Sequence, residues 1–521
     1  MKMGFNVRSR IKLKSLLPLF IIMALFAVAK LFFLFRYHLP IWDEAVYLGM
    51  GKYIYSLGSS GLWEMLRPPA LPFLIGWVWK LKLPYTFFAE VITLLFGAAS
   101  IYVSYLIADK VFSRKVAILA AALLATSPLF YLYSSFILTE VPALFFVLAA
   151  LYFFIKRRYY FCGTSAALAM LFKFPNGLVL VAIAAAVIIS GLISRKPLWP
   201  QLVKLVKVAA SFFLVTLPFL AFNYVFYRAF TSNPYDAIFR PFILGVWHQS
   251  NPAKAIASPL LNYLFYVVEA FKQHFVFVLG AIAVFVFFKK KWYSSVGKML
   301  LASFLVVYAA YFTYIPNKDE RFLILFLPAI CLFAAAAFFE TVNYFKGAKK
   351  HVGHSISHIK AVRSFALVAA ISLLVLSFAV AAYKDYHFYS WRTSSEPAVV
   401  SELYKSVSKL GIKGAVLTSE PVFSAYNDNR FFPYYFTSYE SIPQELKALN
   451  EWEQNKSFEA VIYSPQTLFC QQFDTECQAA KANMYDYLQS NFKEVFSGSY
   501  YDGRISYFIF ANASLYGKPS S

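Results

Sequence analysis

Two adjacent carboxylates, Asp43 and Glu44, stand directly after a long apolar stretch, in the sequence LPIWDEAVYLGMGK. Ionisable side chains at the edge of a membrane-spanning stretch are costly, so they are usually paired or functional. On a helix, neighbouring residues point about 100° apart, so one acid can face a cavity while the other faces solvent or a structural partner. We expect Asp43 to be the catalytic member of the pair. The alternative is that both residues cap a helix with negative charge near its N-terminus.

Three basic residues occupy contexts suited to a phosphate ligand: Arg67 before Pro68-Pro69, Lys173 in LFKFPNG, and Arg321 in KDERFLILFLPA. The prolines block a helix on their N-terminal side and allow one to begin after them, which would hold the guanidinium at the membrane surface. A guanidinium is a forked donor that matches phosphate oxygens. The alternatives are that Arg67 anchors its segment in the lipid headgroups and that Lys173 extends along apolar surface to reach water.

Two further polar residues are candidates for the same chemistry. Glu140, in SSFILTEVPALFF, begins an apolar stretch and is either a second acidic site or the first-turn acid of a helix. His248 could join Glu140 or Asp43 as a metal ligand, although a lone histidine beside a tryptophan is more often an interfacial hydrogen bonder. No nucleotide-binding glycine motif, HExxH or paired CxxC occurs in the sequence, so no cofactor is predicted and a divalent metal remains an alternative.

The composition indicates that lipid is the main solvent of these residues. Of the 521 residues, 60% are hydrophobic and only 14% are charged, and the mean hydropathy is +0.57. Soluble domains carry about 25% charged residues. The net charge of +23 would suggest nucleic acid in a soluble chain, but in a membrane chain it first indicates cytoplasmic loops. We therefore expect a polytopic, all-α membrane domain and no nucleic-acid partner.

Apolar stretches give about eleven transmembrane helices, at residues 16–35, 84–108, 116–134, 138–155, 160–173, 175–193, 205–224, 262–288, 299–315, 322–339 and 364–382. The N-terminal 15 residues hold basic residues and no acid, which places the N-terminus in the cytoplasm. Segment 67–83 is barely long enough to cross. If it does not cross, the later basic loops all fall in the cytoplasm, so the positive-inside rule favours a partly embedded helix and an outer loop at 36–83.

The same topology places everything after residue 383 outside. We therefore divide the chain into a membrane domain, 1–382, and a small extracytoplasmic α/β domain, 383–521. In the second domain the pattern predicts helices at 396–410 and 478–488, strands at 414–418 and 460–463, and a hairpin over 495–510. Cys470 and Cys477 lie in this domain and are either a local disulfide or free thiols.

In the order of these pieces the chain resembles the GT-C membrane glycosyltransferases, in the glycosyltransferase family 39-like branch of the protein O-mannosyltransferases and lipid A aminoarabinose transferases. The resemblance is carried by WDEAVY, RPPALPFLIG, SPLFYLYSSFILTEVPALFF, LFKFPNG and KDERFLILFLPA, which lie in family order between residues 42 and 329. It implies a GT-C fold and transfer of a sugar from a polyprenyl-phosphate or dolichyl-phosphate donor to an acceptor hydroxyl at the outer membrane face, usually with inversion.

Residue by residue, the resemblance implies that Asp43 is the base that takes the proton of the acceptor hydroxyl and that Glu44 is secondary. It implies that the donor phosphate is bound by Arg67, Arg321 and, as a weaker third, Lys173. Glu140 matches the family's second acidic position. Leu66 stands where the aminoarabinose enzymes have a glutamate that can join a metal site, so the carried-over metal is in doubt.

The sequence thus favours a multi-pass glycosyltransferase of the cell membrane, or of the endoplasmic reticulum in a eukaryote. Its partners would be the bilayer, a polyprenyl-phosphate sugar, and a glycan, lipid or protein acceptor. The alternative from another class is a transporter or flippase of lipid-linked sugars, because phosphate binders on the outer face would suit it equally well.

Overall fold

The computed structural model describes residues 16–35, 39–195, 197–228, 231–249, 258–347, 357–392, 396–434, 458–467, 475–500 and 505–512. The chain divides into two compact units. Unit 1 comprises Met1–Phe33, Thr93–Ser135 and Thr139–Tyr389, and unit 2 comprises Leu34–Ile92, Phe136–Leu138 and Ser390–Ser521. This division differs from the one at residue 382 that the sequence suggested, because segment 34–92 packs with the C-terminal part of the chain.

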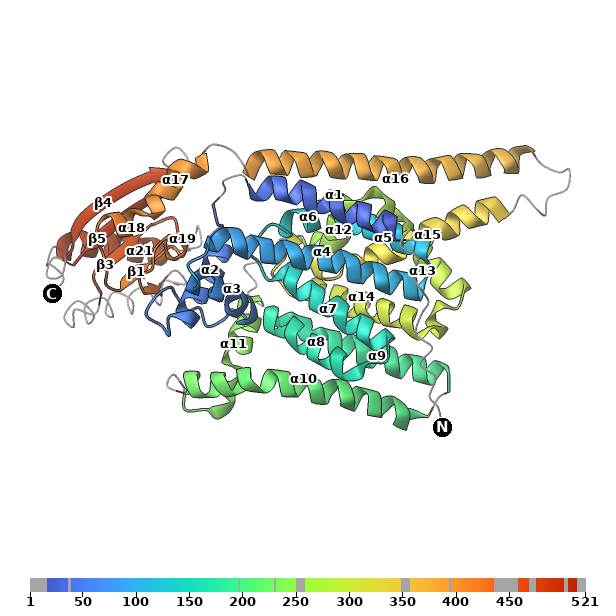
Figure 1. The fold of residues 1–521 in the computed structure, drawn as a ribbon, viewed down its shortest axis with the longest axis horizontal. Helices are drawn as coiled ribbons and strands as arrows, with labels where there is room; N and C mark the ends of the chain where they lie inside the picture. Colours follow the sequence, from blue (N-terminus) through green and yellow to red (C-terminus); the bar gives the residue numbers. More distant parts are fainter. Residues whose placement is uncertain are drawn as a thin grey trace. The chain divides into compact units, whose positions relative to one another are not determined.

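Unit 1 is a bundle of helices that run alongside one another (Figure 1). Helix α7 packs on its sequence neighbour α8, whereas α8 also packs on α10, α9 on α14 and α5 on α15. The helices of this unit, including those that reach its boundaries, are α1 (Leu17–Leu34), α4 (Tyr85–Val111), α5 (Arg114–Ala125), α6 (Pro128–Tyr133), α7 (Glu140–Ile155), α8 (Tyr159–Phe172), η2 (Phe174–Gly177), α9 (Leu178–Ile193), α10 (Leu198–Tyr227), α11 (Pro234–Gln249), α12 (Pro259–Gln273), η4 (Phe275–Leu279), α13 (Gly280–Lys289), η5 (Trp292–Ser294), α14 (Val296–Tyr314), η6 (Glu320–Leu325), α15 (Leu327–Gly347) and α16 (Ser357–Arg392).

Among the described residues, six helices are long and apolar enough to cross a membrane. They lie at Tyr85–Val111, Phe174–Ile193, Trp199–Tyr227, Val296–Tyr314, Leu327–Tyr344 and Leu367–His387. Shorter apolar helices cover other predicted spans, among them Leu17–Phe32, Glu140–Ile155, Tyr159–Phe172 and Phe275–Lys289. The chain is thus mostly helical with several candidate spans, and the number eleven stays a prediction.

The doubtful segment 67–83 forms a short helix, α3 (Ala70–Lys80). Its 11 residues cover roughly 17 Å at about 1.5 Å per residue, about half of the hydrocarbon core of a bilayer. The helix begins directly after Pro68-Pro69, where the missing amide protons of proline cost nothing. Its length fits the expectation of a helix that does not cross.

Unit 2 contains a five-stranded sheet with the order β2-β1-β3-β5-β4. The parallel strands are β2 (Phe431–Pro433), β1 (Val416–Thr418) and β3 (Ala460–Tyr463), and Val416 pairs with both Phe431 and Ala460. The antiparallel part is β5 (Ile505–Ala511) and β4 (Lys493–Tyr500). The helices of the unit are α2 (Trp42–Tyr55), α3, α17 (Glu396–Tyr404), α18 (Ser406–Lys409), α19 (Val422–Tyr426) and α21 (Thr475–Asn491).

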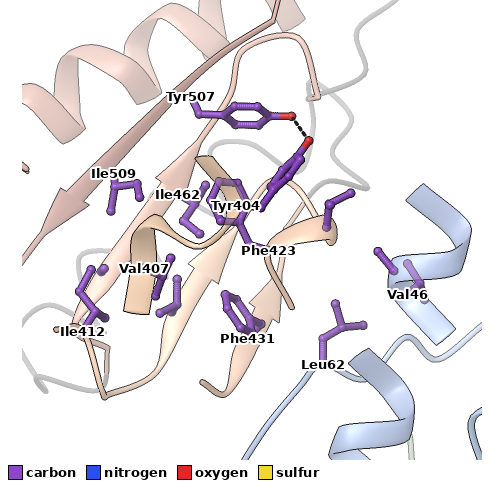
Figure 2. Close-up of a cluster of buried hydrophobic side chains, with 14 of the residues drawn as sticks. Val46, Leu62, Tyr404, Val407, Ile412, Phe423, Phe431, Ile462, Tyr507 and Ile509 are labelled. Carbon is purple, nitrogen blue, oxygen red and sulfur yellow. Dashed lines mark hydrogen bonds between the residues drawn. The ribbon is translucent and has the colours of Figure 1, made fainter. Parts of the chain in front are cut away.

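Alternation along the strands divides the core of unit 2 between the two faces of the sheet. Val416, Ile462 and Ile509 contribute to one cluster, whereas Leu417 and Val461 contribute to the other, which includes residues of α21. The first cluster is shown in Figure 2 and contains side chains of α17, α18 and α19. It also contains Ala45, Val46, Met50 and Leu62, which come from the predicted outer loop 36–83. That loop is therefore part of the hydrophobic core built on the sheet.

The secondary structure expected after residue 396 is found with shifted ends. The strand predicted at 460–463 is confirmed over the same residues, and helix 396–410 is interrupted into α17 and α18. The sequence does not predict the short strand β2, because three residues are too few to show the alternation of apolar and polar residues that marks a strand. Cys470 lies outside the described residues, as does the side chain of Cys477, so the disulfide stays a prediction.

Candidate active site

Helix α2 begins at Trp42 and carries both predicted acids in its first turn. The Glu44 carboxylate accepts hydrogen bonds from two backbone amides, that of Ile41 at 2.7 Å and that of Ile137 at 2.8 Å. The first of these closes the N-terminus of the helix, as a third-position glutamate does in a capping box. Glu44 is fully buried. Its two oxygens are used by the backbone, so its geometry is that of a positioning residue.

Asp43 meets Arg67, which lies 24 positions later in the chain. The distance between Asp43 Oδ1 and the Arg67 guanidinium is 2.6 Å, and the two side chains are only 15% and 16% exposed. Burial disfavours the charged guanidinium, but the charges of Asp43 and Glu64 outweigh it and raise the pKa of Arg67 well above its ordinary value. The ring of Tyr47, one helical turn after Asp43, lies 5.6 Å from the guanidinium carbon. The predicted base and the first predicted phosphate binder are therefore in direct contact.

Glu64 is the second acid at Arg67 and was not predicted from the sequence. Its carboxylate accepts from Nε of Arg67, and its side chain is only 4% exposed. The guanidinium thus joins two carboxylates, the arrangement that its planar fork favours. The signal in the sequence was the spacing of three residues between an acid and an arginine within a short loop.

A second cluster lies in unit 1, around Glu140 at the start of α7. The ammonium of Lys173, between α8 and η2, lies 2.7 Å from Glu140 Oε1, and Arg321 Nε, in η6, lies 3.6 Å from the same oxygen. Arg321 also pairs with Asp319 at 2.6 Å. Glu140 is 2% exposed at its side chain. The structure therefore brings three of the predicted site residues together, with Lys173 and Arg321 on the buried carboxylate of Glu140.

Glu140 is the first residue of α7, so its carboxylate lies in the first turn of the helix. Among the described residues, its second oxygen, Oε2, is buried and has no hydrogen-bond partner. The ring of Phe322 lies 5.0 Å from the Lys173 ammonium, within the range of a cation–π contact. In this state the two cations are neutralised by acids, so a phosphate would have to join or replace those contacts.

The predicted site residues thus fall into two groups, each within its own unit. Asp43 and Arg67 are joined in unit 2, with Glu44 supporting the helix, and Glu140, Lys173 and Arg321 are joined in unit 1. His248 lies in α11, but its side chain is outside the described part, so its metal role stays a prediction. Within the described residues, no group of three or more His, Cys, Asp and Glu side chains could hold a metal ion.

Comparison with known proteins agrees with this fold. The model of the family described as dolichyl-phosphate-mannose-protein mannosyltransferase matches residues 66–222, which include Arg67, Glu140 and Lys173. A search of curated proteins finds no match.

Solved structures resemble the whole chain at low sequence identity. ArnT from Cupriavidus metallidurans, crystallised with undecaprenyl phosphate, superposes with a TM-score of 0.59 at 15% identity, over 96% of this chain and 99% of that one. The oligosaccharyltransferase AglB from Archaeoglobus fulgidus, in complex with an inhibitory peptide and a dolichol-phosphate, gives a TM-score of 0.54 at 13% identity, over 98% of this chain and 75% of that one. The chain therefore has the GT-C fold and is similar to the protein O-mannosyltransferase and ArnT-like group of membrane glycosyltransferases.

Proposed function

We propose that the protein transfers a sugar from a polyprenyl-phosphate donor to an acceptor hydroxyl, with inversion at the anomeric carbon. The observation that carries this proposal is the contact of Asp43 with Arg67 at 2.6 Å within a GT-C fold. In this contact a carboxylate that can accept a proton lies beside a guanidinium that can donate hydrogen bonds to a phosphate. The undecaprenyl phosphate bound to ArnT supports the same class of lipid ligand for this chain.

In the proposed reaction Asp43 takes the proton of the acceptor hydroxyl as its oxygen attacks the anomeric carbon. The bond from that carbon to the phosphate oxygen breaks, and its electron pair leaves with the polyprenyl phosphate. This leaving group is already an anion and needs no proton, so one base suffices, unlike the two carboxylates of glycosidases. Attack on the face opposite the leaving group gives inversion.

The cations stabilise the charge that develops on the departing phosphate. Arg67 contacts two acids, and a phosphate oxygen that displaces Asp43 from the guanidinium would release the carboxylate to act as base. Lys173 and Arg321 are assigned to the donor phosphate as well, with Glu140 as the acid that orders them. Preplaced charges in a poorly solvated site need little reorganisation during the reaction.

No step is assigned to a metal. The two carboxylates at the Asp43 site already share the positive charge of Arg67, and a dication placed between them would be repelled by the guanidinium. The residues at this site therefore do not fit the metal that the sequence left open.

The topology belongs to the same proposal. The basic loops are assigned to the cytoplasm, and the Asp43 helix and the sheet of unit 2 to the outer side of the cell membrane or to the lumen of the endoplasmic reticulum. For a protein of the cell membrane, an impermeant thiol reagent applied to sealed right-side-out vesicles should label a cysteine introduced at position 413, which lies in the loop before β1. Protection of that cysteine would contradict the orientation.

The activity is tested by release of labelled polyprenyl phosphate from a panel of polyprenyl-phosphate sugars by the purified protein in lipid nanodiscs. Separate reactions contain a hydroxyl-bearing peptide, a glycolipid or an oligosaccharide as acceptor. Wild-type turnover with one of them, lost in a folded Asp43→Asn variant and kept in the matched Asp109→Asn variant, is the expected result. Asp109 pairs with Arg114 and has none of the roles assigned to the site residues. Movement of the donor across vesicles without cleavage would replace the transferase by the flippase.

A further inference from the structure

Helix α2 carries a buried lysine on the side opposite Asp43, the proposed catalytic base. Nine positions separate Asp43 from Lys52, and at about 100° per residue they lie on opposite faces of the helix. The side chain of Lys52 is only 4% exposed. A buried ammonium is costly unless it is paired, so its partners are of interest.

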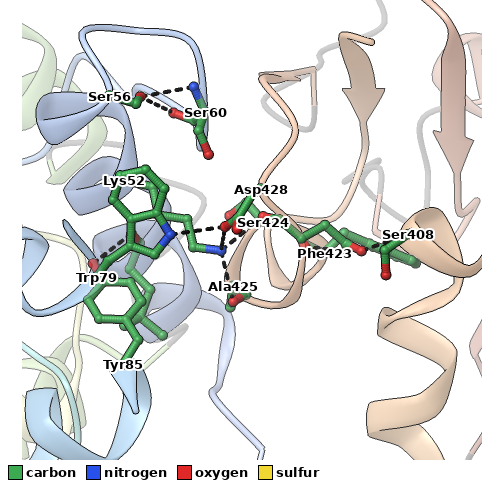
Figure 3. Close-up of polar contacts among 12 residues, drawn as sticks. Lys52, Ser56, Ser60, Trp79, Tyr85, Ser408, Phe423, Ser424, Ala425 and Asp428 are labelled. Carbon is green, nitrogen blue, oxygen red and sulfur yellow. Dashed lines mark hydrogen bonds and ion pairs between the residues drawn. The ribbon is translucent and has the colours of Figure 1, made fainter. Parts of the chain in front are cut away.

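The partners of Lys52 come from one short segment more than 370 residues later (Figure 3). Its ammonium donates to the backbone oxygens of Ala425 at 3.2 Å and Asn427 at 2.9 Å, and lies 3.0 Å from the carboxylate of Asp428. The indole of Trp79, in α3, donates to the same Asp428 oxygen at 3.0 Å. Asp428 therefore joins α2 and α3 to the sheet of unit 2.

The loop that leads to Arg67 is fixed on the same segment. The amide of Gly61 donates to Asn429 at 2.8 Å, and the amide of Phe431 donates to Gly61 at 2.7 Å, so the loop continues the edge of the sheet beside β2. Gly61 has a φ of +75°, and a Cβ there would lie 2.1 Å from the oxygen of Gly49 in α2. Only glycine permits this approach of loop, helix and sheet.

Both members of the Asp43–Arg67 pair are thus anchored on residues 425–431, Asp43 through the far face of α2 and Arg67 through the start of its loop. We propose that Lys52 and Asp428 are positioning residues, and that their ion pair sets the relative placement of Asp43 and Arg67. The expected changes in kinetics rest on the proposed function, whereas the expected changes in hydrogen exchange rest on the structure alone.

The ion pair can be weakened by mutation without disturbing the core, because only its Lys52 end is buried. The Asp428 side chain is 70% exposed, whereas Lys52 is buried. Burial lowers the pKa of Lys52 and the charge of Asp428 counteracts it. Loss of the Asp428 charge therefore weakens the hold on α2 while the two backbone acceptors of Lys52 remain, which makes Asp428→Asn a mild change from which folding is expected to survive.

The kinetic test compares wild type with Asp428→Asn, its charge-preserving counterpart Asp428→Glu, and Glu402→Gln. Glu402 is an exposed acid of the same unit that pairs with Lys405 and Lys409, so its variant removes two ion pairs, neither of which includes a residue of α2. In Asp428→Asn we expect kcat to fall about tenfold, because small misplacement of reacting groups is costly, with a smaller change in KM for the donor. Asp428→Glu should recover most of the loss, and Glu402→Gln should match wild type.

A pH profile separates positioning from general damage. If Arg67 moves away from Asp43, the carboxylate loses a cation that favours its charged form, so the acid limb of the kcat/KM profile moves to higher pH. A loss of folded protein alone would scale the whole profile and leave its limbs in place. An unchanged kcat with an unchanged acid limb in Asp428→Asn, or an equal loss in Glu402→Gln, would overturn the proposal.

Hydrogen exchange tests the same inference without any turnover. We expect faster amide exchange over residues 42–48 and 61–67 in Asp428→Asn, and not in Glu402→Gln, when the full-length protein is held in nanodiscs. If wild type shows no transfer with any donor, the proposed function fails, and this measurement still decides the positioning role. Unchanged exchange in both segments would refute it.

Discussion

The carboxylate of Asp43 lies 2.6 Å from the guanidinium of Arg67, so the expected proton acceptor and the expected phosphate binder neutralise each other. Glu64 completes the arrangement by pairing with Nε of the same guanidinium. A donor phosphate that reaches Arg67 therefore exchanges one anion for another and leaves the total charge of the contact nearly unchanged. Substrate binding and release of the base would be one event.

The first prediction concerns the fork of Arg67. Lysine keeps the positive charge, but it lacks the planar guanidinium whose separate N–H groups bind Asp43 and Glu64. Arg67→Lys should lower kcat/KM for the donor about 10- to 100-fold, and Arg67→Gln about 1,000-fold, since both the orientation and then the charge are lost. Steady-state kinetics measure both values. Arg114→Lys, which alters an exposed pair with Asp109, serves as the control, and wild-type activity in Arg67→Lys would contradict the prediction.

The second prediction separates Glu44 from Asp43. In Glu44→Gln only one oxygen remains to accept from the backbone amides of Ile41 and Ile137. The new NH₂ group then faces the other amide N–H, and two donors cannot form a hydrogen bond. We expect a loss of about 1–3 kcal/mol in stability, read as a lower apparent Tm. The kcat of the surviving folded protein should stay well above that of Asp43→Asn. A variant as inactive as Asp43→Asn at an unchanged Tm would instead make Glu44 part of the chemistry.

These two residues show what the sequence could and could not predict. The acidic pair after an apolar stretch indicated a helix start and a functional carboxylate, and the structure has that helix. Which acid is buried follows from contacts with Ile137, far along the chain, and no local pattern encodes them. The family resemblance ranked Asp43 above Glu44, and this ranking stays a prediction.

Long-range packing explains the features that the sequence did not reveal. A lysine in a helix usually extends its side chain to reach water. The residues near Lys52 in the sequence therefore gave no indication that it is buried against residues 425–428. For the same reason the loop 36–83 was assigned to the membrane domain, although Val46 and Leu62 belong to the core built on the sheet. The local period of apolar residues predicts helices and strands, whereas the surface against which each apolar face packs depends on the whole fold.

The third prediction addresses the cluster around Glu140. Lys173→Met leaves this buried carboxylate with Arg321 at 3.6 Å, and breaking one partner of a buried ion pair costs about 3–5 kcal/mol. The single variant should therefore lose stability. The double variant Lys173→Met/Glu140→Gln removes both charges and should recover most of it.

The double variant also tests phosphate binding. If Lys173 binds the donor phosphate, the double variant should bind undecaprenyl phosphate about tenfold more weakly than Glu140→Gln alone, because these two variants differ only in the Lys173 cation. Tryptophan fluorescence or microscale thermophoresis in nanodiscs gives the Kd. Equal affinity of the folded double variant and Glu140→Gln would assign Lys173 to structure alone.

The fourth prediction concerns metal removal. Because Arg67 supplies the positive charge between Asp43 and Glu64, treatment with EDTA should leave the transferase rate within about twofold of the untreated rate. In Arg67→Gln the two carboxylates lose their shared cation, so added Mg²⁺ should restore part of the lost activity there and not in wild type. A wild-type rate that disappears with EDTA and returns with a divalent ion would show that a metal takes part.

The fifth prediction uses a buried acid of the sheet unit, Glu420, which follows β1. It is 4% exposed, and its oxygens accept weak hydrogen bonds from the hydroxyl of Tyr507 at 3.3 Å and the amide of Val422 at 3.4 Å. Burial raises the pKa of Glu420 to about 8. In the unfolded chain a glutamate ionises near pH 4.3, at about its reference value.

Between these two values the folded protein keeps a proton that the unfolded chain releases, so this group makes stability fall as pH rises from about 4.3 to 8. Glu420→Gln removes the titration and should flatten the dependence of Tm on pH. At pH 8 the variant should be more stable than wild type by about 1–3 kcal/mol, and at pH 5 the two should be similar, because wild type is then neutral as well. Melting curves at both pH values check this, with exposed Glu402→Gln as the control. Equal slopes in wild type and Glu420→Gln would mean that Glu420 is ionised in the folded state.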